Sequence, residues 1–156
     1  MKAIIVCSER LIMKPRSLKE MQNLYEIESD MEMKQAYLEM IEEMKKDTSN
    51  EYWASDWSIT LKSGEEIGGI GFKGKPNQVG SVEVGYGINP NYQRQGYATE
   101  ALRAMVRWGF TQDGVECIEA QTEEWNEISK KVLRKNDFME IGMGMEGNLF
   151  AIRKEK

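Results

Sequence analysis

The sequence predicts an α/β domain of the α+β type, with a mixed, mostly antiparallel sheet of six to seven strands flanked by about four helices. Apolar residues alternate with other residues from Val82 to Ile88, which is the period of a half-buried strand, and the pattern stops at Asn89-Pro90. From Ala98 to Trp108, apolar residues recur every three or four positions, which is the period of an amphipathic helix. The centre of the domain is therefore a strand, a loop and a helix.

Two helices and a hairpin are predicted before the central strand. An extended segment covers residues 2–15. Ser17 and Glu20 have the spacing of a capping box, which predicts a helix that begins there, and a second helix covers residues 33–44. A hairpin up to Lys73 follows, so that three antiparallel strands precede the central helix.

Two features of this region allow more than one interpretation. Gly68, Gly69 and Gly71 leave little side-chain bulk in the second hairpin strand, and we interpret them as structural, either at a bulge or at a close backbone approach. We interpret the methionines at positions 31, 33, 40 and 44 as ordinary core residues, with an adaptable binding groove as the alternative.

The chain after the central helix predicts a parallel partner for the central strand. Gln112-Asp113-Gly114 ends the helix, and a strand-like run covers residues 115–122. A strand that follows a crossover helix runs parallel to the strand before it, so two parallel strands that diverge would leave a cleft for a ligand. A helix over residues 126–135, with Ile128 facing inward, and a final pair of strands over residues 138–153 complete the prediction.

Length and composition indicate one domain over residues 1–156 with a sizeable core. Hydrophobic residues make up 40% of the chain and charged residues 30%, and no run of 18 apolar residues exists, which argues against a membrane protein. The first ten residues lack the length and the cleavage site of a signal peptide, so a cytoplasmic location is expected.

Charge and residue types exclude several classes of protein. The net charge of −5 argues against a nucleic-acid binder, which needs clustered lysines and arginines. The chain has no histidine, which excludes Ser-His and Cys-His catalysis. Cys7 and Cys117 lack the spacing of metal ligands and are expected to be buried, reduced thiols, so no metal is predicted.

The loop from Gln93 to Ala98 is predicted to bind an anion. Backbone N–H groups at the start of a helix have no intrahelical partner, and together with the helix dipole they favour a phosphate group, to which Gly96 permits close approach. The loop lacks the Gly-Lys-Ser/Thr of a Walker motif and the glycine triplet of a Rossmann motif. The simpler interpretation is a tight strand-to-helix turn.

This loop resembles the acetyl-CoA signature of the GNAT acyltransferases, Gln/Arg-x-x-Gly-x-Gly/Ala, here Gln93-x-x-Gly96-x-Ala98. The longer string from Gly85 to Ala101 resembles the branch that includes the ribosomal-protein N-terminal acetyltransferases. The resemblance implies that the co-substrate is acetyl-CoA and that its diphosphate lies on the loop residues Gln93, Arg94, Gln95, Gly96, Tyr97, Ala98 and Thr99.

A second signature of the same branch covers Asn126, Ser129, Leu133 and Phe138. The resemblance implies that Asn126 holds the pantetheine arm and that Ser129 relays a proton to the leaving thiolate. The simpler interpretations are a helix N-cap and an exposed helical serine. Many members of the superfamily have a tyrosine general acid where this chain has Leu133.

The implied reaction needs a base, because only a neutral amine can attack a thioester. The resemblance suggests Glu83 on the central strand as this base, with an exposed strand glutamate as the simpler interpretation. It also suggests the backbone N–H near Ile88 as the donor to the oxyanion. Three tyrosines are possible acids in reserve: Tyr86, Tyr92 and Tyr97.

The sequence therefore predicts an enzyme, an N-acetyltransferase that moves an acetyl group from acetyl-CoA to a primary amine by direct attack in a ternary complex. The acceptor is a protein N-terminus or a small-molecule amine, and a homodimer is possible. The alternative is a CoA-binding regulatory or interaction module without catalysis. A third possibility is that the loop binds another nucleotide.

Overall fold

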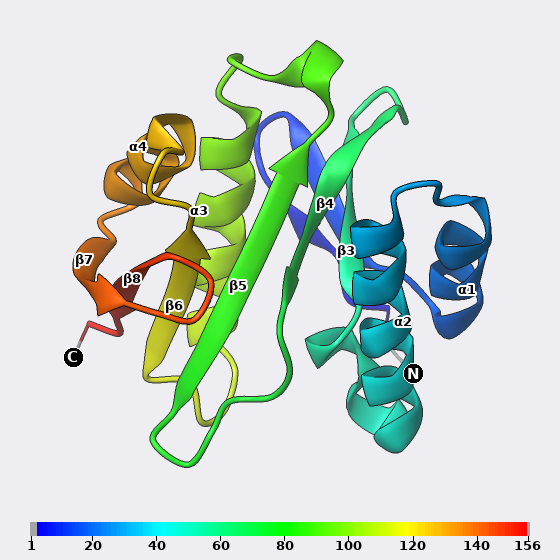
Figure 1. Cartoon of the computed structure of the whole chain (residues 1–156), viewed down its shortest axis with the longest axis horizontal. Helices are drawn as coiled ribbons and strands as arrows, with labels where there is room; N and C mark the ends of the chain where they lie inside the picture. The colour runs from blue at the N-terminus through cyan, green and yellow to red at the C-terminus, as the bar shows by residue number, and fades with distance from the viewer. Residues whose placement is uncertain (1–2, 156) are drawn as a thin grey trace.

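The computed structural model describes residues 3–155. Four α-helices, two 3₁₀ helices and eight strands follow one another in this part of the chain (Figure 1). In chain order they are β1 (Val6–Cys7), β2 (Leu11–Pro15), α1 (Leu18–Ile27), α2 (Met31–Lys46), η1 (Thr48–Trp53), β3 (Asp56–Leu61), β4 (Glu66–Phe72), β5 (Ser81–Ile88), η2 (Pro90–Tyr92), α3 (Tyr97–Phe110), β6 (Cys117–Thr122), α4 (Glu127–Lys135), β7 (Met139–Met143) and β8 (Asn148–Arg153).

The strands form one mixed sheet in the order β1-β2-β3-β4-β5-β6-β8-β7. Within residues 3–155, β5 and β6 are the only parallel neighbours, which confirms the prediction of a mostly antiparallel sheet. The sheet has eight strands rather than six or seven, because the N-terminal extended segment folds back on itself. The Ser8 N–H donates to the Leu11 carbonyl at 2.9 Å, so that Val6 pairs with Met13.

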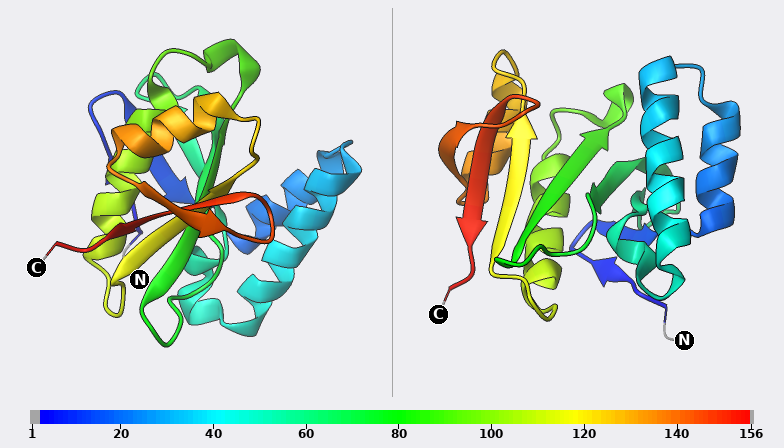
Figure 2. Two further views of the ribbon diagram at one scale, coloured as in Figure 1. Left: turned by 60° about the vertical axis from the view of Figure 1, so that its left-hand side comes forward. Right: turned by 60° about the horizontal axis from the view of Figure 1, so that its bottom comes forward.

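The parallel strands separate along their length. Their pairing covers only residues 81–83 of β5 and 117–119 of β6, and beyond Glu83 the two strands diverge towards their C-terminal ends (Figure 1 and Figure 2). β6 stays paired with β8 over its whole length, so it is the far half of β5 that leaves the partner strand. The predicted split between two parallel strands is confirmed.

The two faces of β5 have different surroundings. Val82 and Val84 point into the main core, which includes Trp57 of β3 and Leu102 of α3. Because side chains alternate along a strand, Glu83, Gly85 and Gly87 lie on the opposite face. That face is directed towards α1 and α2, which pack on each other around a smaller cluster of their own, formed by Met21, Ile41 and Met44.

Several side chains differ from the sequence prediction. Cys7 is exposed rather than buried, because it lies on a two-residue edge strand whose other residue, Val6, faces the core; Cys117 is buried, and both thiols are free. Ile128 is 58% exposed, because it lines a cavity instead of the core. Met44 is a core residue as predicted, whereas Met33 lines a different cavity.

Gly71 and Gly85 are paired in the sheet, and we expect their substitution by alanine to change the free energy of unfolding in opposite directions. A Cβ atom at Gly71 would lie 2.6 Å from the Ser55 carbonyl oxygen, whereas at Gly85 the nearest atom would be the Lys73 Cε at 3.6 Å. Gly71→Ala should therefore lower the free energy of unfolding by about 1–3 kcal/mol. Gly85→Ala should raise it by about 0.5–1 kcal/mol, because alanine loses less backbone entropy than glycine. Urea unfolding of both variants tests this, and equal shifts would contradict it.

Candidate active site

The loop between β5 and α3 presents helix N–H groups to the surface. Arg94 and Gly96 have positive φ angles of 63° and 84°, which turn the chain sharply before α3 begins at Tyr97. Gly96 occupies the N-cap position, and no side chain caps the helix there. The N–H groups of the first turn are therefore available to an anion, and the positive end of the helix dipole adds to the attraction.

Side chains hold this loop from behind. Gln93 Nε2 donates to the Ile88 carbonyl at 2.8 Å, and Gln95 Nε2 donates to the Asn91 carbonyl at 3.4 Å. Arg10 Nη1 donates to the Gln95 carbonyl at 3.1 Å, and its guanidinium lies over the Tyr97 ring. The two glutamines thus fix the backbone of the loop, and the backbone itself is the surface offered to the ligand.

Glu100 would repel an anion at this helix end if its charge were not compensated. Its carboxylate accepts hydrogen bonds from Ser8 Oγ at 2.5 Å and from the Arg10 backbone N–H at 2.7 Å, and it forms an ion pair with Arg10 Nε at 2.6 Å. Burial raises the pKa of Glu100, but these hydrogen bonds outweigh burial and hold the pKa below its ordinary value. The turn between β1 and β2 therefore neutralises the carboxylate and leaves the N–H groups free to attract an anion.

A cavity of about 670 Å³, which we call the loop cavity, lies between the separated end of β5, this loop and α4. Of the nine residues that the sequence assigns to the co-substrate, all except Gln95 line it. These are Ile88, Gln93, Arg94, Gly96, Tyr97, Ala98, Thr99 and Asn126. Trp125, Ile128, Lys131 and Lys135 also line it and were not predicted from the sequence.

The Ile88 backbone N–H points into the gap between the parallel strands. In an antiparallel pair, backbone groups alternate between facing the partner and facing away. Asn89 N–H donates to the Ile67 carbonyl of β4 at 2.8 Å, so Asn89 and Gly87 face β4. Ile88 faces the other way, towards β6, beyond the last paired residue of β5. Its N–H can therefore reach a ligand in the loop cavity.

Asn126 and Ser129 lie at the start of α4, on the far side of the loop cavity. Asn126 Oδ1 accepts a hydrogen bond from the Ser129 N–H at 3.0 Å, so it caps the helix and keeps its amide NH₂ for a ligand. Ser129 Oγ lies 2.9 Å from the hydroxyl of Tyr86. Burial raises the pKa of Tyr86, and the hydrogen bond with Ser129 opposes this only in part, so the phenol stays protonated at neutral pH. This hydrogen bond joins β5 to α4 across the gap.

The other two tyrosines have different contacts. The Tyr92 hydroxyl donates a hydrogen bond to the Glu65 carboxylate, and the Arg10 guanidinium lies over the Tyr97 ring. Of the three tyrosines considered as alternative general acids, Tyr86 is therefore the one that forms a hydrogen bond with Ser129. The sequence pattern does not single it out, because its partner lies 43 residues further along the chain.

A second cavity, of about 570 Å³, opens on the α1–α2 face of the sheet, and we call it the helix-pair cavity. Leu24, Met33, Tyr37 and Met40 line it from the helices, and Gly85 and Gly87 line it from the sheet. Tyr86, Gly87 and Ile88 line both cavities. The two cavities therefore meet at the C-terminal half of β5.

Charged residues lie at the helix-pair cavity, each in contact with opposite charges. Arg16 contacts Asp56, with Nε 3.5 Å from Oδ2, and its Nη1 contacts Glu66. Lys73 Nζ lies 2.8 Å from Glu83 and 3.0 Å from Glu146. Each cation thus contacts two carboxylates. Asp56 and Glu66 line the cavity with the two cations, whereas Glu83 and Glu146 contact Lys73 from outside the lining.

Glu83 lies at the paired end of β5, away from the place where the cavities meet. Besides its contact with Lys73, it accepts a hydrogen bond from Gln121 Nε2 at 3.1 Å. It is four residues from Gly87, which corresponds to about 13 Å along a strand. The structure therefore does not bring Glu83 together with Ser129, and its role as the base stays a prediction.

The acetyltransferase (GNAT) domain family matches residues 10–139, which is most of the chain and includes both sides of the loop cavity. The chain belongs to this family. YjdG of Bacillus subtilis, an N-acetyltransferase by name, is 37% identical over 84 residues, which is 53% of this chain and 50% of YjdG. The GNAT chain thus spans about half the length of that relative.

Solved structures agree with this fold. A GNAT-family acetyltransferase from Bacillus anthracis aligns with 96% of this chain and 98% of its own at 23% identity and a TM-score of 0.69. RimL, a ribosomal-protein alpha-N-acetyltransferase in complex with coenzyme A, aligns with 96% of this chain and 98% of its own at 17% identity and a TM-score of 0.74. At such identities the likeness concerns the fold alone.

Two further features of residues 3–155 concern membranes and metals. None of the helices is long and apolar enough to cross a membrane. In the same part of the chain, cysteine, aspartate and glutamate side chains do not gather in groups of three or more that could hold a metal ion.

Proposed function

We propose that this GNAT protein transfers the acetyl group of acetyl-CoA to a primary amine, by direct attack of the amine in a ternary complex. The observation that carries the proposal is the meeting of two cavities at Tyr86, Gly87 and Ile88. The loop cavity offers helix N–H groups to a diphosphate, and the helix-pair cavity, whose two cations each contact two carboxylates, can accept a cationic amine. Two substrates that enter from opposite faces of the sheet would then meet at β5.

The residues of the loop cavity fit acetyl-CoA. The first turn of α3 would hold the diphosphate, and the free amide of Asn126 would hold the pantetheine arm. Acetyl-CoA supplies an activated acyl group and a thiolate leaving group. The Ile88 N–H would donate to the carbonyl oxygen as negative charge develops on it. Tyr86 and Ser129 would deliver a proton to the leaving sulfur.

The acceptor class follows from the helix-pair cavity. Apolar side chains from α1 and α2 form one wall and glycines form the other, so the cavity suits an amine carried on an apolar stem. A protein N-terminus and a small-molecule amine both satisfy this description.

An assay of free thiol released from acetyl-CoA tests the proposal. A panel should include amino-terminal peptides, lysine peptides, polyamines and aminoglycosides. We expect thiol release that depends on at least one amine, together with mass-spectrometric detection of the acetylated product. Acetyl-CoA binding without amine-dependent release across the whole panel would point to a binding module instead. A thermal shift with ATP or NAD but not with acetyl-CoA would reject the assignment of the loop cavity.

A further inference from the structure

Asp56 places a carboxylate on the floor of the helix-pair cavity, close to where the two cavities meet. A Cβ atom on Gly69 would lie 2.4 Å from Asp56 Oδ2 and 2.8 Å from Oδ1, so the carboxylate lies directly over Gly69. Gly69 is paired in register with Gly87, which lines both cavities. Directly paired residues have Cβ positions about 4.5–5.5 Å apart. Asp56 is therefore one strand away from the proposed site of reaction.

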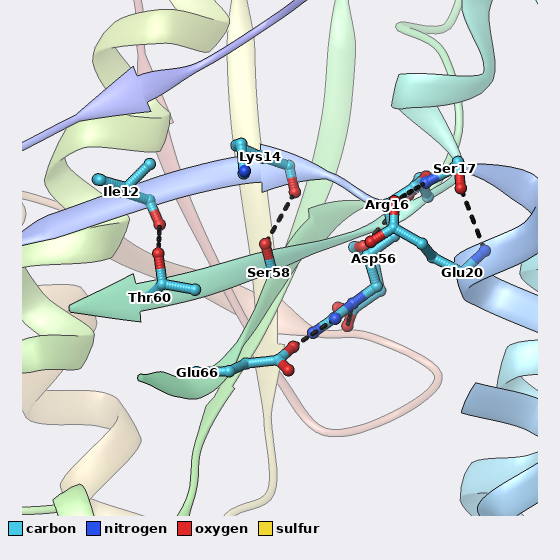
Figure 3. A network of polar contacts seen from close by, with 10 residues as sticks. Ile12, Lys14, Arg16, Ser17, Glu20, Asp56, Ser58, Thr60 and Glu66 are labelled. Carbon is cyan, nitrogen blue, oxygen red and sulfur yellow. Dashed lines mark hydrogen bonds and ion pairs between the residues drawn. The ribbon is translucent and has the colours of Figure 1, made fainter. Parts of the chain in front are cut away.

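Arg16 compensates the negative charge of the Asp56 carboxylate only in part. Its neighbour Arg16 has a side chain that is only 10% exposed, and the Nε of Arg16 lies 3.5 Å from Oδ2 without forming a hydrogen bond. The Nη1 of Arg16 is directed instead to Glu66, as Figure 3 shows. The Asp56 side chain is 20% exposed, so a ligand in the cavity can reach it.

Glu83 is exposed to a similar extent, 23%, and it also shares its cation with a second carboxylate, but it differs from Asp56 in position and in hydrogen bonding. It lies about 13 Å along β5 from Gly87. Lys73 Nζ lies 2.8 Å from its Oε2 without forming a hydrogen bond, and Gln121 Nε2 donates to its Oε1 at 3.1 Å, so an amide already donates to this carboxylate. Glu83 would have to act through a chain of water molecules, whereas Asp56 lies next to the path of the amine.

We propose that Asp56, rather than Glu83, is the general base that accepts a proton from the acceptor amine. This assignment rests on the proposed acetyl transfer and adds a catalytic residue to it. The Asp56 carboxylate would first bind the acceptor as an ammonium ion, which the apolar wall of the cavity partly desolvates. It would then take one proton and leave a neutral amine.

The subsequent steps balance in atoms and charge. The amine nitrogen forms a bond to the carbonyl carbon, and the carbon–sulfur bond breaks as the intermediate collapses. The thiolate takes a proton from Tyr86 through Ser129. The amine nitrogen then loses its second proton, which restores the proton on Tyr86. The ammonium ion and acetyl-CoA thus give an acetamide, free CoA thiol and one proton, which Asp56 releases to solvent.

The charge environment of Asp56 suits this role. Burial raises the pKa of Asp56 to about 6, Arg16 opposes the rise, and Glu66 adds to it. Burial raises the pKa of the Tyr37 phenol on α2, and the charge of the Asp56 carboxylate adds to the rise. A carboxyl group with this pKa is ionised above about pH 6, so kcat/KM for the amine should fall as the pH drops through that value.

The test measures kcat/KM for the best acceptor from pH 5 to 9 in four proteins: the unchanged chain, Asp56→Asn, Glu66→Gln and Glu83→Gln. Asp56→Asn should lower kcat/KM at pH 8 by about 100-fold, with the Kd for acetyl-CoA unchanged. It should also remove the acidic limb of the pH profile, which is the fall in kcat/KM as the pH drops through about 6. Glu66→Gln should keep the limb but move it to lower pH, because it removes a negative charge that disfavours ionisation of Asp56. Glu83→Gln should keep the limb in place.

A purely structural role for Asp56 predicts a different result. Asp56→Asn and Glu66→Gln each remove one carboxylate from Arg16, so a structural role would lower stability in both and leave the limb where it was. An unchanged limb in Asp56→Asn, or its loss in Glu83→Gln alone, overturns the assignment while acetyl transfer stands. If the unchanged chain transfers no acetyl group to any amine, both the assignment and the proposed function fail.

Discussion

Gly96→Glu is expected to abolish acetyl-CoA binding in a chain that still folds, with the Kd raised by more than about 100-fold. The Cβ of the new side chain would lie 3.3 Å from Arg10 Nη2, and its carboxylate would add a negative charge at the N-cap of α3, where the N–H groups are proposed to hold the diphosphate. The substitution also strains the backbone, because Gly96 has a φ of 84°, and such a conformation costs an L-residue about 1–2 kcal/mol.

Gly64→Glu is the matched control for that strain. Gly64 has a φ of 102° in the turn between β3 and β4, and no atom lies within 4 Å of where its Cβ would be. Both variants should lose similar stability in thermal unfolding, but only Gly96→Glu should lose acetyl-CoA binding in calorimetry. Equal affinities in the two folded variants would show that the first turn of α3 does not hold the diphosphate.

The parts of the site that are local in sequence could be predicted from the sequence. The change from a period of two to a period of 3.6 between Ile88 and Ala98 marks the strand, the loop and the helix, and Gly96 lies where the helix starts. The left-handed residue after α4 has a similar local cause, because aspartate tolerates this conformation better than most residues and Asp137 has a φ of 66°. Short-range backbone chemistry determines each of these features.

The acceptor side of the site could not be predicted in this way. Asp56 occupies the first position of a strand, where a polar residue is unremarkable in sequence. Its significance depends on Gly69 and Gly87, which belong to two other strands and come together only through the register of the sheet. Glu83 is suggested by the resemblance, which implies a carboxylate on the central strand, and the sequence does not indicate that Lys73 contacts it. Contacts between strands that are distant in sequence depend on the sheet register, which the local sequence pattern does not determine.

Tyr86→Phe and Ser129→Ala should each lower kcat by about 100-fold and leave the Kd for acetyl-CoA nearly unchanged. The two hydroxyl groups are 2.9 Å apart, so either substitution breaks the same hydrogen bond between β5 and α4. Without this bond, the proposed path of the proton to the leaving thiolate is interrupted. Tyr52→Phe is the matched control, because its hydroxyl contacts Asn50 and lines neither of the two cavities.

The double variant distinguishes one proton path from two. If Tyr86 and Ser129 act as a unit, Tyr86→Phe combined with Ser129→Ala should be no slower than the slower single variant. Multiplied effects, close to 10,000-fold, would mean that the two hydroxyl groups act independently. Full activity in both single variants would remove the pair from the proton path, and Tyr92, Tyr97 or a water molecule would then have to supply the proton. Single-turnover kinetics at saturating acetyl-CoA measures the chemical step directly and separates it from product release.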